Sequence, residues 1–277
     1  MRGVLVVAVL LTLGSSGCQS ARSVLPVDLR PADLVPPTDS RLLTTHDTAV
    51  RGIAAMLARD FGLPVPDRVT VYVYGSQRGF EEGLVHDADL SPGRAAELGE
   101  FAVGVGRRRQ LLFRDDPTDR GREWLRLVAH ELAHVCQIEL ARGERGPAQW
   151  VKEGMAEWVA FSVLERLGID LLAQRRERAR AGVSRSRVVA AARLDLDALG
   201  SPAGFIARHR RDGTLATYQI SFLMVDHLVD RHGFASVVAY FRAFTKSRDR
   251  QANFRRVFGQ TVTMFGQEFL TDLATKR

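Results

Sequence analysis

Apolar residues recur every three or four positions from Arg122 to Ala141, and no Gly or Pro interrupts them. This spacing predicts one amphipathic helix over residues 122–141. A second helix is predicted over residues 149–161, after Pro147. Its polar positions are unusual, because Glu153 and Glu157 stand one turn apart on a helix that is otherwise largely apolar. Two like charges in that setting cost free energy unless a positive group compensates them.

The segments before these two helices predict both helices and strands. Residues 44–61 predict a helix, and the β-branched and aromatic residues of 68–74 predict a strand. Another helix is predicted after Pro92. Residues 101–105 and 110–114 predict a hairpin. The sequence therefore predicts a small sheet on the N-terminal side of the two long helices.

The segments after the two helices are mainly helical. The charged residues of 170–193 predict a helix, and the Gly, Pro and Arg residues of 200–213 predict a loop that could form a wall or a lid. Further helices are predicted over 216–231, 234–246, 250–258 and 265–275. Together these segments predict an α+β fold, in which a small mixed sheet and the first long helix precede a mainly helical lobe.

The N-terminus has the pattern of an export signal. A positive start and an apolar run over residues 3–13, too short to span a membrane, predict a signal peptide over 1–17. Small residues directly before Cys18 resemble a bacterial lipobox, which predicts that Cys18 carries lipid. The Pro, Ser and Asp residues that follow predict a flexible tether over residues 18–40. Gln19 favours the outer membrane, facing the periplasm. The alternative is an ordinary secreted protein with an incidental cysteine.

The formal charge is +7, and arginine supplies nearly all the positive charge. The arginines of 107–109 and 175–193 could contact anionic lipid or cell-wall polymers, and the alternative is a solvated basic face. An exported chain with no recognisable module is not expected to bind nucleic acid. With lipid on Cys18, only Cys136 remains, so no disulfide is expected. We expect Cys136 to be a small buried apolar residue.

A metal site is predicted where the two long helices meet. His130 and His134 stand about 40° apart on consecutive turns of one helix, so both can bind one metal ion. Glu131 lies about 100° from His130, beside such an ion and not on it. Glu153, nineteen residues after His134, offers a carboxylate from the second helix. Two imidazoles and one carboxylate, with a fourth position open, are typical of a catalytic Zn²⁺ site with one ion per chain.

This pattern resembles the gluzincin zinc metallopeptidases, the group that holds aminopeptidase N and thermolysin. The likeness rests on His-Glu-x-x-His at 130–134 and on Glu153 within Trp-x-x-Glu-Gly. Within that group, the chain most resembles the short bacterial family called peptidase MA-like, and the resemblance extends from about Thr45 to the C-terminus. The later segments that resemble this family are 218–222, 225–233 and 257–260. The resemblance implies a zincin-like (thermolysin-like) metallopeptidase domain over 41–277.

The resemblance and the chemistry assign roles around the metal. Glu131 would be the general base that takes a proton from water and passes it to the leaving amine. Glu157 would hydrogen-bond a ligand imidazole and so fix its tautomer. In aminopeptidase-N-like enzymes a tyrosine at a comparable distance stabilises the oxyanion, which makes Tyr218 the first candidate here. His227 and His209 are further candidates, and the alternative for Tyr218 is a core residue with a satisfied hydroxyl.

The resemblance also implies a function. We expect a zinc metallopeptidase, lipid-anchored in a bacterial cell envelope, that acts as a monomer on peptide or protein substrates held along the predicted hairpin. The aminopeptidase segment Gly-x-Met-Glu-Asn is absent, and the nearby Glu97 and Glu100 do not match it, so an endopeptidase is favoured. One alternative is an inactive zincin-scaffold lipoprotein that acts in binding or envelope assembly. Another is a zinc hydrolase that cleaves a non-peptide amide.

Overall fold

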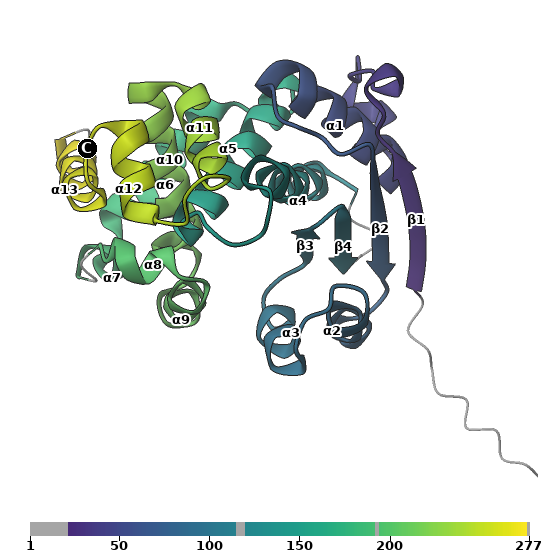
Figure 1. Cartoon of the computed structure of the whole chain (residues 1–277), viewed down its shortest axis with the longest axis horizontal. Coiled ribbons are helices and arrows are strands. Elements are labelled where there is room, and N and C mark those ends of the chain that lie inside the picture. Colours follow the sequence, from purple (N-terminus) through teal and green to yellow (C-terminus); the bar gives the residue numbers. More distant parts are fainter. Residues whose placement is uncertain (1–21, 115–119, 192–193, 276–277) are drawn as a thin grey trace, which may run out of the picture.

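The N-terminal part of the molecule is built on a small mixed sheet. The structure is a computed structural model that describes residues 22–114, 120–191 and 194–275. The strand order is β1–β2–β4–β3, with β2 parallel to β4 and both outer strands antiparallel to their neighbours (Figure 1). The strands are β1 (Arg22–Asp28), β2 (Arg68–Tyr74), β3 (Gly104–Arg107) and β4 (Gln110–Arg114). The predicted strand over 68–74 and the predicted hairpin are thus confirmed, but the first hairpin strand lies at 104–107 instead of 101–105.

The predicted tether over 18–40 is wrong from Arg22 onward. Residues 22–28 form the edge strand β1, which pairs with the whole of β2, and two short 3-10 helices follow it. Pro26 concealed this strand, but an edge strand tolerates a proline because one side of its backbone needs no partner. The predicted signal peptide and Cys18 lie outside the described residues.

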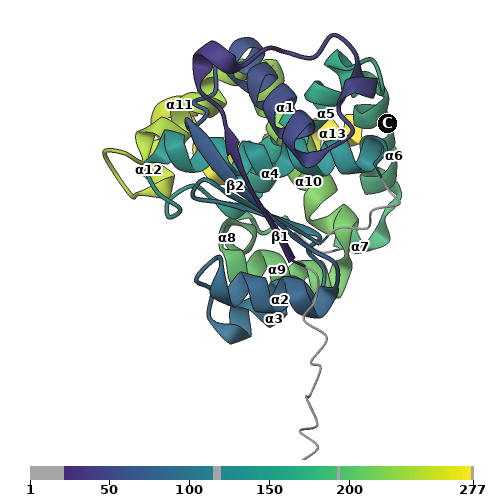
Figure 2. The ribbon, with the colours of Figure 1, turned by 90° about the vertical axis from the view of Figure 1, so that its right-hand side faces the viewer.

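Helices cover both faces of the sheet. On one face, α1 (His46–Phe61) and α4 (Arg122–Ala141) pack against the odd-numbered residues of β2 and β4, such as Val71 and Leu111. On the other face, α2 (Gln77–His86) and α3 (Pro92–Gly99) pack against even-numbered residues such as Leu112 (Figure 2). This alternation follows from the two-residue period of a strand. It places α4 between the sheet and the rest of the molecule (Figure 1).

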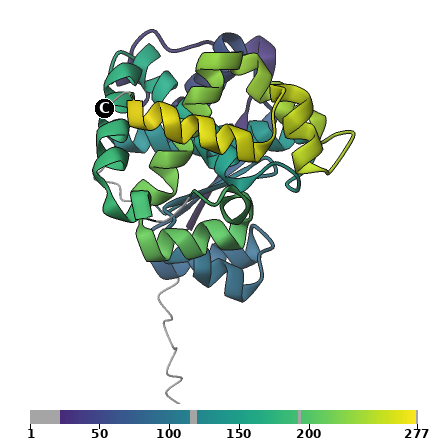
Figure 3. The ribbon, with the colours of Figure 1, turned by 90° about the vertical axis from the view of Figure 1, so that its left-hand side faces the viewer.

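The second part of the molecule is helical. Its centre is formed by α5 (Gln149–Arg166) and α10 (Tyr218–His232), which pack against each other, and α5 also packs on α4. Figure 3 shows this part from the side away from the sheet, with the yellow C-terminal helix in front. The remaining helices are α6 (Leu172–Arg185), α7 (Arg187–Ala191), α8 (Leu196–Gly200), α9 (Pro202–Asp212), α11 (Phe234–Ala243), α12 (Arg250–Phe258) and α13 (Val262–Thr275). The α+β class, with a small sheet followed by a helical lobe, is therefore confirmed.

The predicted loop over 200–213 is wrong, because most of it is helix α9. Ser201 caps this helix by accepting a hydrogen bond from the backbone N–H of Gly204, and Pro202 occupies the first turn. Proline is favoured at that position, where its missing N–H has no intrahelical partner to lose. The Gly and Pro residues therefore start a helix here instead of breaking one.

Much of the predicted basic surface is paired within the protein. Arg107 pairs with Glu144, and Arg176 binds Asp226 through two hydrogen bonds of 2.6 and 2.7 Å. These arginines therefore contribute to the fold as well as to the net charge. Within the described ranges, no helix has both the length and the apolar character needed to cross a membrane.

Gly154 lets α5 and α10 approach closely beside the predicted metal ligand Glu153. A Cβ atom at Gly154 would overlap the backbone oxygen of Ser221 on α10. We expect Gly154→Ala to lower the free energy of unfolding by about 1–3 kcal/mol, because neither backbone can move without disturbing the packed helices. Urea unfolding measures the effect, and Gly93→Ala on α3, where a Cβ meets nothing within 4 Å, is the control. Equal stability of the two variants would contradict the close-packing argument.

Candidate metal centre

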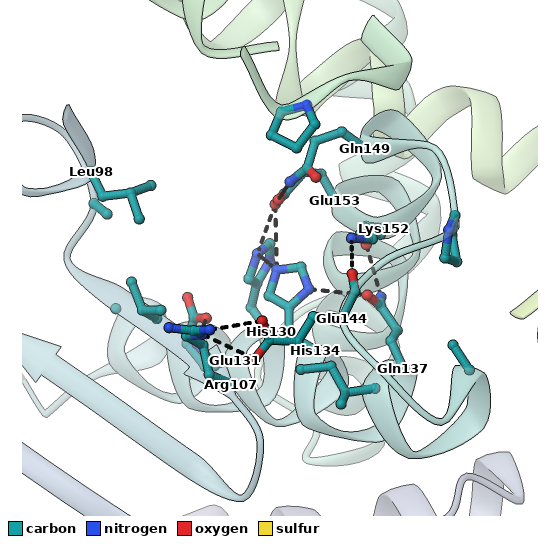
Figure 4. A pocket seen from close by; sticks show the side chains of 18 of the residues that line it. Leu98, Arg107, His130, Glu131, His134, Gln137, Glu144, Gln149, Lys152 and Glu153 are labelled. Carbon is teal, nitrogen blue, oxygen red and sulfur yellow. Dashed lines mark hydrogen bonds and ion pairs between the residues drawn. The ribbon is translucent and has the colours of Figure 1, made fainter. Parts of the chain in front are cut away.

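Three predicted ligands meet in the structure. The Nε2 atoms of His130 and His134 lie 3.1 Å apart, and the Oε2 atom of Glu153 lies 3.3 and 3.5 Å from them (Figure 4). Ligand atoms bound to one tetrahedral zinc ion stand roughly 3.3–3.6 Å apart. The observed triangle is close to that size. This buried group could therefore hold one metal ion.

The two helices that carry these ligands explain the arrangement. His130 and His134 project from consecutive turns of α4, and α5 packs along α4 so that Glu153 faces them. The connection is short because Arg142 adopts a left-handed conformation (φ 52°) that ends α4 and turns the chain back. The side chains of His130 and Glu153 are only 7 % and 9 % exposed.

Glu157 lies where the sequence predicts, against the far side of a ligand histidine. Its Oε1 atom is 3.3 Å from Nδ1 of His130 and accepts a 2.7 Å hydrogen bond from Arg126. An acceptor at Nδ1 favours the tautomer that leaves Nε2 free for a metal. Arg126 was not predicted from the sequence, although it stands one turn before His130 on the same helix.

Gln137 places an acceptor at Nδ1 of His134, as Glu157 does at Nδ1 of His130. The sequence analysis did not predict this role of Gln137. Its Oε1 atom lies 3.1 Å from Nδ1 of His134, and its amide nitrogen donates to the backbone oxygen of Lys152 at 2.9 Å. The second bond fixes the amide orientation, so the oxygen is the atom that faces the imidazole. A position three residues after a ligand histidine on one helix was the signal that could have revealed it.

Gln149 orients the third ligand. Its amide nitrogen donates to Oε1 of Glu153 at 2.7 Å, which leaves Oε2 to face the two histidines. We expect Gln149→Leu to weaken zinc binding by roughly 10–100-fold, as the loss of an outer hydrogen bond to a metal ligand typically does. Competition with a chromophoric chelator measures the affinity. Gln174→Leu on α6 is the matched control, and equal zinc affinity in both variants would contradict this role.

The buried carboxylates of the site favour a positive charge between them. Burial opposes the charged form of His130, but the carboxylates of Glu153 and Glu157 outweigh it and raise its pKa to about 10. Burial likewise opposes ionisation of Glu153, yet the neighbouring His134 and His130 lower its pKa. In the absence of a metal, the protonated imidazole thus balances the buried carboxylates. The donor set and its charge therefore fit a divalent cation.

Glu131 lies between α4 and the sheet edge. Its Oε2 atom accepts a 2.6 Å hydrogen bond from the backbone N–H of Gly106 on β3, and the residue is 5 % exposed. A Cβ at Gly106 would overlap the backbone oxygen of Glu131, so only glycine lets β3 pass this close to α4. The sequence predicts Glu131 as the base, but it did not reveal that Gly106 holds this carboxylate. The sequence placed Gly106 in the turn of the predicted hairpin, after the strand over 101–105, where a glycine gives no sign of such a contact.

Tyr218 is placed at the site, as predicted, at the first turn of α10. Its ring centroid lies 6.4 Å from that of His130, and burial followed by the charges of Glu153 and Glu131 raises its pKa well above the usual value. His209, one of the further candidates, packs edge-on against Tyr218 at 5.5 Å. The other, His227, lies away from the metal ligands and hydrogen-bonds Glu268 on α13.

Two cavities flank the metal ligands. One has a volume of about 290 Å³ and the other about 330 Å³, and His130, Glu131 and Tyr218 border both. Phe101 also borders both cavities, and its ring centroid lies 5.0 Å from that of His209, which borders the larger one. The arrangement is therefore a cleft that continues on either side of the candidate metal position, bounded on one side by β3.

The chain was compared with protein-family models, with curated proteins and with solved structures, and none of these comparisons gave a match.

Proposed function

We propose that this protein is a zinc-dependent metallopeptidase that cleaves peptide bonds within peptide or protein substrates. The observation that carries the proposal is the triangle of two Nε2 atoms and one carboxylate oxygen, 3.1–3.5 Å on a side, with Glu131 beside it in the wall of a cleft. The proposal includes membership of the gluzincin group and a zincin-like fold. It draws support from the order of an edge strand, a helix with two histidines and a helix with the third ligand.

His130, His134 and Glu153 would hold the zinc ion. Two imidazoles and one carboxylate are a donor set that catalytic zinc uses, and they leave one position open. A zinc ion bound there would supply Lewis acidity, which polarises a carbonyl and lowers the pKa of water. The oxygens of Glu157 and Gln137 that face the two imidazoles, and the hydrogen bond that Gln149 donates to Glu153, would keep the ligands in place before the metal arrives.

The other residues of the site would move the proton and stabilise charge. Glu131 would take the proton from the attacking water and give it to the nitrogen of the leaving amine. The N–H of Gly106 holds one oxygen of that carboxylate, which leaves the other free to accept the proton. The hydroxyl of Tyr218 would donate a hydrogen bond to the oxyanion that develops on the carbonyl.

An extended peptide would lie along β3. This strand is at the edge of the sheet and borders the cleft. The N–H of Gly106 is bound to Glu131, and the other outward backbone groups of the strand would pair with the substrate. Glu97 and Glu100 are unsuited to hold a free amino terminus, because Glu97 pairs with Arg94 and Glu100 accepts a 2.5 Å hydrogen bond from Arg210. Both points favour an endopeptidase.

The proposed location is the bacterial cell envelope, with a lipid on Cys18 that anchors the protein to the outer membrane. Strand β1 begins four residues after Cys18, so the lipid and the folded domain would be at most about 14 Å apart along the chain. The domain would therefore lie close to the membrane surface. A secreted protein without lipid is the alternative.

The proposed activity is tested with a random peptide library and mass spectrometry of the products. We expect internal cleavage that stops when a chelator removes the metal and returns when zinc is added back. Protein that holds one zinc ion per chain and cleaves no peptide would contradict the proposal. It would favour a zincin-scaffold lipoprotein that acts in binding.

A further inference from the structure

Lys152 lies in the wall of the 290 Å³ cavity, one residue before the ligand Glu153. Its Nζ atom donates a 2.9 Å hydrogen bond to the backbone oxygen of Glu144. Among the described residues, no carboxylate oxygen lies within ion-pair distance, 4.0 Å, of this ammonium. Two other cations of the same wall differ, because Arg107 pairs with Glu144 and Arg94 with Glu97.

The carboxylates nearest to Lys152 are already in use. Glu144 binds Arg107 through both oxygens, at 3.1 and 2.7 Å. Glu153 accepts from Gln149 with one oxygen and faces the histidines with the other. An ammonium has three protons to donate, and the backbone of Glu144 takes one. A partly buried cation with unused donors is less well solvated than one in water, and a bound anion would compensate this loss.

The rest of the cavity suits a side chain with an apolar stem. Leu98 and Ile138 line it together with Phe241, and the metal ligands border it. A glutamate or aspartate of the substrate could place its methylene groups against these residues and its carboxylate on Lys152. A charge-assisted hydrogen bond in such a setting is roughly twice as strong as a neutral one.

Taking the proposed peptidase function as given, we propose that Lys152 is a specificity-determining residue that binds a carboxylate of the substrate. The chemical class is an acidic peptide, with a glutamate or aspartate next to the cleaved bond. The same ammonium would accept a free C-terminal carboxylate, which has the same chemistry but would make the enzyme act near chain ends.

Lys152 also holds the segment between α4 and α5, and this role must be separated from substrate binding. Lys152→Gln keeps an N–H donor for the oxygen of Glu144 and removes the positive charge. Lys152→Met removes both. A residue that only holds the segment would show a defect in Lys152→Met and none in Lys152→Gln. A residue that binds a carboxylate loses that ability in both variants.

The experiment measures peptide binding to the zinc-loaded protein by fluorescence anisotropy, in a Glu131→Gln background that prevents cleavage. The probes are labelled hexapeptides with one glutamate moved along the chain, each with a glutamine twin and each with a free or an amidated C-terminus. We expect glutamate at one position to bind about ten-fold more tightly than glutamine. We expect Lys152→Gln to reduce this ratio to about one without changing zinc content.

Each other outcome has a definite meaning. If only the free C-terminus improves binding, and Lys152→Gln removes the gain, the bound carboxylate is the terminal one. If glutamate gives no gain, or if the gain survives in Lys152→Gln, the proposal is overturned. Lys246→Gln, an exposed lysine beyond α11, is the control and should keep the full ratio. Because binding is measured without cleavage, an inactive wild-type protein would contradict the peptidase function and leave this result standing.

Discussion

Replacement of Glu131 by glutamine is expected to abolish peptide cleavage while zinc stays bound. The amide keeps the shape of the carboxylate and can still accept the hydrogen bond from the N–H of Gly106, so the local structure should persist. It cannot take a proton from water, and general-base catalysis is typically worth about 10²–10⁴-fold in rate. We expect a loss of at least that size in the cleavage rate of a fluorogenic peptide. Metal analysis of the same sample should give about one zinc per chain, because a catalytic zinc site with three protein ligands binds a single ion.

Glu139→Gln is the matched control for this change. Glu139 also lies on α4. Its side chain is more exposed than that of Glu131 and forms an ion pair with Arg109. An exposed ion pair of this kind contributes little, so activity and zinc content should stay near those of the wild type. Full activity in Glu131→Gln would show that another group takes the proton. A drop of equal size in both variants would point to a general disturbance of α4.

The candidate metal ligands were predictable because the spacing that defines them is local. Two histidines four residues apart in a helix must lie on one face, whatever the rest of the chain does. Glu153 required one further step, the packing of a second helix against the first, and its polar place on an apolar helix was the signal. Glu157 followed from the same face of that helix. Tyr218, by contrast, was placed only by the resemblance.

The parts that sequence analysis missed depend on tertiary contacts. Strand β1 contains Pro26, which weakens the strand pattern, and it forms because β2 offers it a partner along its full length. Gly106 acts through its backbone N–H, and no side chain marks that use. Gln149 and Gln137 are ordinary residues on helix surfaces until the fold places a carboxylate or an imidazole beside them. Sequence gives the identity of the ligands more readily than the groups that orient them.

The candidate metal position is surrounded by buried carboxylates, whose negative charge must be compensated. Glu131, Glu153 and Glu157 are all buried, which is unfavourable without compensating charge. Arg126 compensates Glu157, and Gly106 gives Glu131 a hydrogen bond. The facing oxygen of Glu153, by contrast, has only the two imidazoles as partners among the residues that the structure describes. A dication at that point would neutralise the remaining charge. The geometry of the ligands and the charge of their surroundings thus lead to the same expectation about metal binding.

Replacement of Glu153 by alanine is expected to remove most zinc binding. The variant keeps both histidines but loses the one anionic ligand, and it leaves the amide of Gln149 without its acceptor. Wild-type protein reconstituted with zinc should hold about one ion per chain. At a free zinc concentration of about 1,000 times the dissociation constant, binding should stabilise the folded wild type by about 4 kcal/mol. Under the same conditions Glu153→Ala should hold much less zinc and should gain little of this stabilisation.

Mass spectrometry of the metal content and thermal unfolding with and without zinc measure these two effects. Glu165→Ala is the control, because Glu165 is an exposed residue further along the same helix and its main partner is the backbone N–H of Leu172. It should bind zinc like the wild type. Undiminished zinc affinity in Glu153→Ala would remove Glu153 from the ligand set. A wild-type protein that takes up no zinc even after reconstitution would contradict the metal site itself, and the catalytic proposal with it, because Glu131 would then have no Lewis acid beside it.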